Sequence, residues 1–179
     1  MTPEFYNKFT ANDDRKIFWE NGQTVDVTDM GEFTNGIGFQ KYKNVTSAGN
    51  PGKADGFPDT DFPVFRYADV LLMAAECAVR GASIDGLSAF NQVRERAGMP
   101  AVNALNLNEI IDERGRELYQ ECWRRNDLIR FGLFTGSDYV WQWKGGVQGG
   151  TGVDSYRALF PIPDSDRLAN NKLSQNQGY

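Results

Sequence analysis

Three glutamates recur at four-residue intervals in the segment "DERGRELYQECWRRNDLIRFG", residues 112 to 132. They are Glu113, Glu117 and Glu121. On a helix, side chains four residues apart are neighbours on one face, with Cβ atoms about 5–6 Å apart. That spacing resembles the separation of about 5–5.5 Å between the two carboxyl groups of a retaining glycosidase. The chemistry to consider first is therefore acid–base cleavage of a glycosidic bond.

The direction and the surroundings of these carboxylates argue against catalysis. Glycosidase carboxylates flank the scissile bond from two sides, whereas side chains on one helix face project side by side. Neighbouring arginines also favour the ionised carboxylates, whereas a general acid needs a raised pKa. These arginines are Arg114, Arg116, Arg124 and Arg125. We therefore interpret the charges as a framework in which arginines and carboxylates pair between helices and fix their register.

The composition removes several other classes of chemistry. The 179 residues include no histidine, which excludes serine–histidine and cysteine–histidine mechanisms and removes the commonest metal ligand. The glycine-rich stretch "GGVQGGTG" (residues 145 to 152) lacks the strand–loop–helix context of a nucleotide-binding loop. The formal net charge of −5 disfavours a nucleic-acid partner. We expect no enzymatic activity, no metal or other cofactor, and no bound nucleic acid.

The two cysteines, Cys77 and Cys122, fall in two segments that both have helical patterns. We expect two buried free thiols, with a disulfide between them as the alternative. The start of the chain has no apolar core of a signal peptide, and no later run approaches the length of a membrane-spanning helix. The sequence as it stands is expected to be soluble.

Three helical segments are predicted to position the charged residues. The stretch 65–80 is apolar nearly all round and predicts a buried helix that ends at Gly81. A short turn leads to a second helix over 85–97, antiparallel to the first. Asn106 and Glu109 form the pattern of a capping box, from which either one helix of about 25 residues or two helices with a break should follow.

The first predicted helix carries a narrow polar stripe that includes Asp69 and Glu76. A nearly apolar helix cannot leave both carboxylates buried without a partner. We therefore predict that at least one of them pairs with an arginine of the other helices. The candidates are Arg94, Arg96, Arg114, Arg116, Arg124 and Arg125.

Outside these helices the chain has the composition of loops. Residues 1–63 alternate short β-like runs with Asn-Gly and Gly signals, which predicts a loop-rich lead-in with brief strands. Residues 133–179 comprise a glycine-rich loop, an extended proline-containing segment and a polar tail. The length fits a single region over 1–179, with its helical core at 64–132. The fold class we expect is mainly α, with long irregular loops and minor β structure.

Four linked motifs resemble the SusD/RagB family of nutrient-binding outer-membrane lipoproteins of Bacteroidetes, in the carboxy-terminal part of that family. They are "FRYADVLLMAAEC" (65–77), "FNQVRERAGMP" (90–100), "IIDERGRELYQECWRRNDLIRFG" (110–132) and "LFPIPDSDRLANNKLSQNQGY" (159–179). More loosely, "FTANDDRKIFW" resembles an Asp-x-Arg segment upstream of them, which falls here on Asp13 and Arg15.

This resemblance implies a tetratricopeptide-like helix pair followed by a long helix. It also implies binding of a glycan, or in some members a peptide, at the cell surface, and transfer of that ligand to a SusC-type TonB-dependent transporter. Family members are much longer, with a signal peptide and a lipidated cysteine before this region. We therefore expect a carboxy-terminal fragment or a truncated gene product, whose parent is anchored to the outer membrane by lipid.

Sugar binding requires flat aromatic faces for apolar C–H patches, and polar groups for hydroxyls. Tyr139, Trp141 and Trp143 alternate in "DYVWQWKGG", so in an extended segment all three would share one side and form a platform. The alternative is that these rings cover the end of the preceding helix. Phe18 and Trp19 form a weaker aromatic pair, for which core packing is the favoured interpretation.

Two other function classes fit the same residues. A helical-repeat adaptor would bind only a protein partner and would not respond to sugars. A glycoside hydrolase would need opposed carboxylates and would release reducing ends. The sequence does not specify which glycan is bound.

Overall fold

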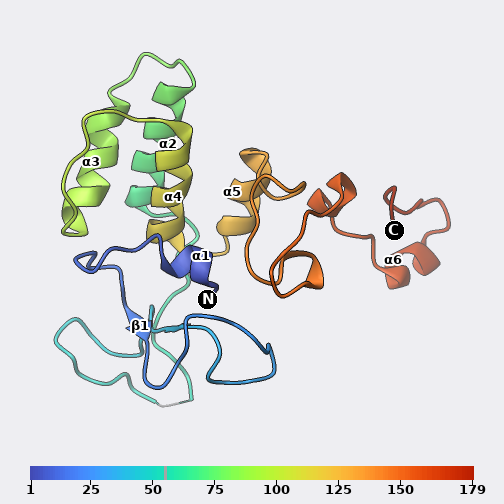
Figure 1. Ribbon diagram of the computed structural model, residues 1–179, viewed down its shortest axis with the longest axis horizontal. Helices are drawn as coiled ribbons and strands as arrows, with labels where there is room; N and C mark the ends of the chain where they lie inside the picture. The colour runs from blue at the N-terminus through green and yellow to red at the C-terminus, as the bar shows by residue number, and fades with distance from the viewer. Residues whose placement is uncertain (55) are drawn as a thin grey trace. The chain divides into compact units, whose positions relative to one another are not determined.

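The computed structural model describes residues 1–54 and 56–179 (Figure 1). The chain divides into two compact units, Met1–Arg124 and Arg125–Tyr179. The fold is mainly helical with little strand, which confirms the expected fold class. The tetratricopeptide-like character of the helix pair, and the single region over 1–179, stay predictions.

The first unit contains a short strand pair, a helical group and the long loops expected before it. Its elements are α1 (Pro3–Tyr6), β1 (Phe18–Trp19), β2 (Gly38–Phe39), α2 (Tyr67–Val79), α3 (Gly86–Arg96) and α4 (Leu107–Leu118). β1 and β2 pair antiparallel, with Phe18 opposite Phe39 and Trp19 opposite Gly38. α2 packs against both α3 and α4 (Figure 1).

The helix ends follow from local residue chemistry. α2 stops before Gly81, whose φ of 103° lies in the region that favours glycine. The side chain of Asp85 accepts a hydrogen bond from the backbone of Ser88 at the start of α3. The side chain of Asn106 accepts one from the backbone N–H of Glu109 at the start of α4, so this predicted cap is confirmed.

The predicted third helix is two helices with a break. α4 ends where Tyr119 turns to an extended conformation, with φ −61° and ψ 146°. Gln120 and Cys122 then adopt positive φ values of 63° each, which no continuing helix allows. The helix resumes as α5 (Arg124–Arg130).

α2 and α3 approach closely because a glycine opens the second helix. A Cβ atom at Gly86 would lie 2.4 Å from the Cβ of Ala78 and 3.0 Å from the Cα of Ala75. The start of α3 therefore lies against the end of α2, and the two helices form the predicted antiparallel pair. Between the three helices lie the buried residues Leu72, Ala75, Phe90, Val93, Ile110 and Ile111.

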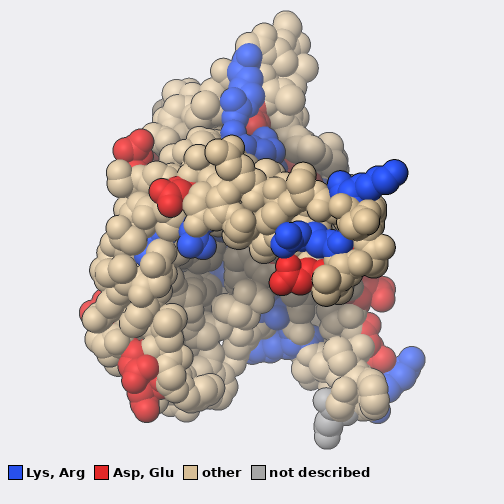
Figure 2. Space-filling view, turned by 90° about the vertical axis from the view of Figure 1, so that its right-hand side faces the viewer, with Lys and Arg blue, Asp and Glu red and all other residues tan. Residues whose placement is uncertain are grey.

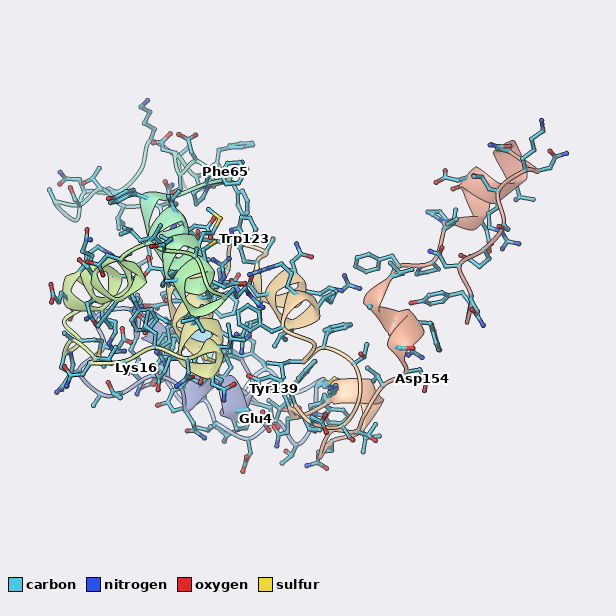
Figure 3. All side chains as sticks on the ribbon, turned by 90° about the horizontal axis from the view of Figure 1, so that it is seen from above. Glu4, Lys16, Phe65, Trp123, Tyr139 and Asp154 are labelled. Atoms are coloured by element: carbon cyan, nitrogen blue, oxygen red, sulfur yellow. The ribbon has the colours of Figure 1, made fainter. Side chains whose placement is uncertain are left out.

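The expectation of a buried first helix is wrong for one side of α2. Tyr67, Val70 and Met73 are exposed there, with 72%, 48% and 41% of their surface accessible. α3 and α4 pack against α2, and this i, i+3, i+6 row of apolar side chains stays exposed. Just before α2, the ring of Phe65 lies 6.3 Å from that of Trp123 (Figure 3).

Both cysteines are free, as expected, but the expectation that they are buried is wrong. Cys77 and Cys122 are exposed. Cys77 belongs to the uncovered side of α2, and Cys122 lies in the turn after α4, where the chain reverses.

The second unit is built around buried polar anchors and not around a helical core. It contains the rest of α5, two short 3₁₀ helices, η1 (Lys144–Gly146) and η2 (Ser155–Ala158), and α6 (Asp164–Ala169). Lys144 is buried, and its Nζ donates hydrogen bonds to the carbonyls of Gly136 (2.9 Å) and Tyr139 (2.6 Å). This lysine therefore ties the glycine-rich loop together from inside.

The terminal "PIP" and "QNQGY" motifs hold each other in place. The side-chain amide of Gln175 accepts a hydrogen bond from the N–H of Ile162 at 2.8 Å and donates one to its carbonyl at 2.9 Å. The ring of Tyr179 stands edge-on to that of Tyr156, with 4.9 Å between centroids. A Cβ atom at Gly178 would lie 2.4 Å from that Tyr156 ring, so only glycine fits there.

Within the described residues, no helix has the length and hydropathy needed to cross a bilayer.

Candidate functional site

The three glutamates of the opening motif are buried and paired with cations. Glu113 accepts hydrogen bonds from Arg15 at 2.6 Å, from Arg94 at 3.1 Å and from Arg116 at 2.5 Å. Arg15 also holds Asp13, with its Nη2 2.8 Å from a carboxylate oxygen. The loosely matched Asp-x-Arg segment therefore belongs to the same cluster as the charged helix.

Arg66 connects the other two glutamates. Its Nη1 lies 2.8 Å from Glu117, and its Nε lies 2.7 Å from Glu121. Lys41 donates to the Glu121 carboxylate and, at 2.9 Å, to the backbone carbonyl of Glu117. The loop after β2 and the residue before α2 are thus fastened to the end of α4 by charge-assisted hydrogen bonds.

The electrostatics of this cluster are the reverse of what a general acid needs. Burial alone would raise the pKa of the Glu113 carboxyl, but Arg116 and Arg15 outweigh burial and hold that pKa below its ordinary value. Burial would also raise the pKa of the Glu121 carboxyl, but Arg66 and Lys41 outweigh burial and hold that pKa below its ordinary value. The cluster is a structural framework, as the sequence indicated.

This framework should make stability fall in acid. The folded-state pKa values of Glu113 and Glu121 are lowered, so the unfolded chain binds protons at a higher pH than the folded chain. Their stabilisation is complete above the ordinary glutamate pKa of 4.5 and disappears as pH falls below it. We expect urea midpoints that are flat between pH 7 and 5 and drop between pH 4 and 3. Equal midpoints at pH 7 and pH 3 would contradict this expectation.

The predicted pairing of the polar stripe is confirmed. Arg114 donates to Asp69 at 2.8 Å, and both side chains are almost completely buried. The other named arginines have different contacts, among them those of Arg94 and Arg116 with Glu113. Arg124 donates to the carbonyl of Ile111 at 2.7 Å, and Arg125 lies in the second unit.

The proposed aromatic platform is only partly formed. The rings of Tyr139 and Trp141 lie 6.2 Å apart at an interplanar angle of 57°. All three aromatic residues are partly exposed. Trp143, however, has φ 68° and ψ 5°, a left-handed conformation that reverses the chain before η1. The expectation of one extended segment with three rings on a side is wrong at Trp143, because alternation ends where the backbone turns.

Trp141 lines a groove of about 790 Å³ in the second unit. The Phe134 ring lies 6.2 Å from the Trp141 ring, and Lys144 Nζ lies 4.7 Å from its centroid. The loop that carries the ring is tightly folded: a Cβ atom at Gly150 would lie 2.3 Å from the carbonyl oxygen of Trp141. The groove volume is within the range of about 300–1,000 Å³ that is usual for small-molecule sites.

Arg125 contacts two of the aromatic rings that line this groove. Its guanidinium lies 3.9 Å from the Phe160 ring centroid and 4.9 Å from that of Phe134. It also donates to the carbonyls of Arg157 and Ala158, at 3.1 Å each. Arg125 therefore holds two aromatic rings at the groove instead of joining the carboxylate framework.

Of the charged side chains that line this groove, Arg125, Lys144 and Arg157 are basic and Asp154 is acidic. Asp154 and Arg157 line the groove and are exposed. The face drawn in Figure 2 has separate basic and acidic side chains among neutral ones. Tyr139 and Asp154, both in the second unit, are labelled in Figure 3. Hydroxyl-rich ligands suit such a mixture of rings, carboxylate and guanidinium.

Sequence reasoning missed the second half of this groove. Phe160 stands beside Pro161 in a motif that was considered only for its resemblance, and Arg125 was assigned to the helix charges. The signal available in the sequence is the apolar dipeptide Leu159–Phe160 before a proline, in a segment without helical or strand periodicity; in the structure both residues are exposed. Within the described residues, no group of acidic and cysteine side chains could hold a metal ion.

The SusD family model matches residues 3–179, nearly the whole chain. The chain belongs to the SusD family. The starch-binding protein SusD of Bacteroides thetaiotaomicron is 41% identical over 174 residues, which cover 94% of this chain and 31% of that protein. SusD-like protein P25 of Formosa agariphila is 34% identical over 129 residues, which cover 65% of this chain and 24% of that protein.

Solved structures agree with the SusD-family assignment. Surface glycan-binding protein A from Bacteroides thetaiotaomicron superposes with a TM-score of 0.73 and 26% identity, covering 97% of this chain and 40% of that one. The names of SusD and of this structural relative both describe binding proteins. The SusD-family chain thus spans about a third of the length of the curated SusD relative, 31%.

Proposed function

We propose that this SusD-family chain binds a glycan at the bacterial cell surface, without cleaving it. Its site is the groove around Trp141, with Tyr139 beside that ring and Trp143 at the edge of the loop. The observation that carries the proposal is an aromatic groove of about 790 Å³, lined by Trp141, Phe134 and Phe160 together with exposed polar groups. The names of the relatives, a starch-binding and a glycan-binding protein, support the ligand class.

The wider setting that we propose follows the family. The parent protein is anchored to the outer membrane by lipid and passes its ligand to a SusC-type TonB-dependent transporter. The carboxylates Glu113, Glu117 and Glu121 support the absence of catalysis, because each is paired with arginine or lysine.

The adaptor function has one observation in its favour. The exposed apolar row Tyr67, Val70 and Met73 on α2 is the kind of surface that protein partners cover. It is compatible with glycan binding, because it lies in the first unit and the groove lies in the second. Binding to a transporter with no response to any sugar would favour the adaptor.

Replacement of Trp141 by alanine should weaken glycan binding at least tenfold, a loss of about 1.4 kcal/mol. A groove that contacts one or two sugar rings implies a dissociation constant near millimolar, about −4 kcal/mol, for the parent chain. Calorimetric titration with maltoheptaose and other oligosaccharides measures both values. Trp123→Phe, which changes an indole outside the groove, is the matched control.

Two outcomes would count against this assignment. If the Trp141→Ala variant binds a sugar with the same affinity as the parent chain, the Trp141 ring packs within the protein and does not form a ligand platform. If reducing ends accumulate above a no-protein control during the same incubations, the chain is an enzyme.

A further inference from the structure

The first unit contains a second groove, next to the strand pair β1–β2. Its volume is about 460 Å³, and three exposed aromatic side chains line it, Trp19, Phe33 and Phe39. The side chains of Gln23 and Gln40 also line it. Phe18 and Trp19, which the sequence suggested as core, therefore have different environments.

The strand register explains why Trp19 faces outward. Phe18 packs into the core, with its ring 4.9 Å from that of Phe9 and 6.1 Å from that of Tyr119. Successive residues of a strand point to opposite faces, so Trp19 points away from this core and is 42% exposed. Gly38 lies directly opposite, where a Cβ atom would approach the Trp19 Cβ to 3.1 Å. The indole therefore stands beside a strand position without a side chain.

Gln23, one of the lining residues, has an unsatisfied acceptor that is itself buried. Among the described residues, the Oε1 atom of Gln23 is buried and accepts no hydrogen bond. A buried acceptor without a donor costs free energy, which favours any turn of the side chain that brings this oxygen to a donor. Besides the amino group of Met1, which donates to the carbonyl of Ile37, the residues lining the groove carry no charge.

We propose that this groove is a second glycan-contact site, for neutral pyranose rings. The Trp19 indole stacks on the apolar C–H face of one ring, and the Gln23 amide, turned into the groove, accepts a hydrogen bond from a hydroxyl. Apart from the Met1 amino group the lining carries no charge, which favours a neutral ligand. The volume suits a small ligand, whereas a protein partner would need a face of about 800 Å².

This site and the Trp141 groove lie in different units and share no residue, so each assignment can fail alone. The test uses the 179-residue chain with ¹⁵N label, in which four tryptophans give four indole N–H signals. Single Trp→Phe variants assign the signals. Maltoheptaose, cellohexaose and xylohexaose are the neutral probes, and oligogalacturonate is the anionic one. We expect at least one neutral probe, and not the anionic one, to move the Trp19 signal, in the parent chain and in Trp141→Ala.

Affinity is then measured by calorimetry in the Trp141→Ala background, where only this groove remains. We expect Trp19→Ala to weaken binding about tenfold and Gln23→Leu about threefold, as loss of one stacking face and one hydrogen bond would do. Phe33→Ala, at a side chain 83% exposed, should also weaken binding and does not threaten folding. Trp123→Phe should bind like its background.

Three results would overturn the proposal. One is a Trp19 signal that no neutral probe moves at tens of millimolar. Another is equal affinity in the Trp19→Ala and Phe33→Ala variants and their background. The third is dimerisation of the parent chain, measured by sedimentation, that Trp19→Ala abolishes, because the groove would then be covered by a second copy.

Discussion

Replacing Glu113 by glutamine is expected to lower the free energy of unfolding by about 3–5 kcal/mol. The carboxylate is fully buried and accepts from three guanidinium groups, those of Arg15, Arg94 and Arg116. Glutamine has nearly the same shape but no charge, so the three cations would keep their desolvation cost and lose their shared anion. In a protein of this size the melting temperature should fall by about 6–20 °C.

Urea and thermal unfolding, followed by circular dichroism, measure this effect. The matched control is Lys16→Met, which removes a partly exposed ion pair to Glu20 at 3.8 Å and a contact of Lys16 with the Tyr6 ring. Exposed pairs contribute at most about 1 kcal/mol, so the control should melt close to the parent chain. If the two variants melt at the same temperature, the buried cluster does not stabilise the fold as its geometry indicates.

Replacing Arg114 by methionine is expected to cost a similar amount, about 3–5 kcal/mol. Arg114 is the largest fully buried side chain, and its Nη1 lies 2.8 Å from Asp69 on α2. Methionine fills the space but leaves the Asp69 carboxylate buried and without its cation. The other Asp69 oxygen has no hydrogen-bond partner among the described residues, so it offers no compensation.

A double variant separates the charge from the packing. Asp69→Ala with Arg114→Met removes both charges, and the flexible methionine can fill part of the remaining space. Replacing both members of a buried pair is often neutral, so the double variant should be more stable than Arg114→Met alone. A double variant less stable than the single one would mean that Asp69 stabilises α2 by a route other than this ion pair.

The charged framework also bears on both proposed glycan sites, in different ways. Lys41, two residues after β2, donates to Glu121 and to the carbonyl of Glu117, so the strand pair beside the Trp19 groove is fastened to α4. Arg125 comes from the same charged stretch of sequence but holds Phe134 and Phe160 in the second unit. Most arginines of this segment therefore support helix packing, whereas Arg125 supports an aromatic groove.

Elements whose causes are local are predictable from the amino-acid sequence alone. The helix pair 67–79 and 86–96, the Asn106 cap and the stop at Gly81 depend on residues within about four positions of one another, and such patterns are visible in one dimension. The need for Asp69 to find an arginine was also predictable, because a buried carboxylate without a partner is too costly. Family membership followed from four motifs in order.

Which surfaces stay uncovered, and which partner each charge takes, depends on how distant segments pack in three dimensions. Trp143 turns the chain because of a left-handed backbone, and Trp19 is exposed because Phe18 takes the inward position on β1. The uncovered side of α2 and the exposure of Cys77 depend on where α3 and α4 pack. These outcomes depend on contacts between residues far apart in the chain, and no periodicity within a segment records which distant segment will cover it.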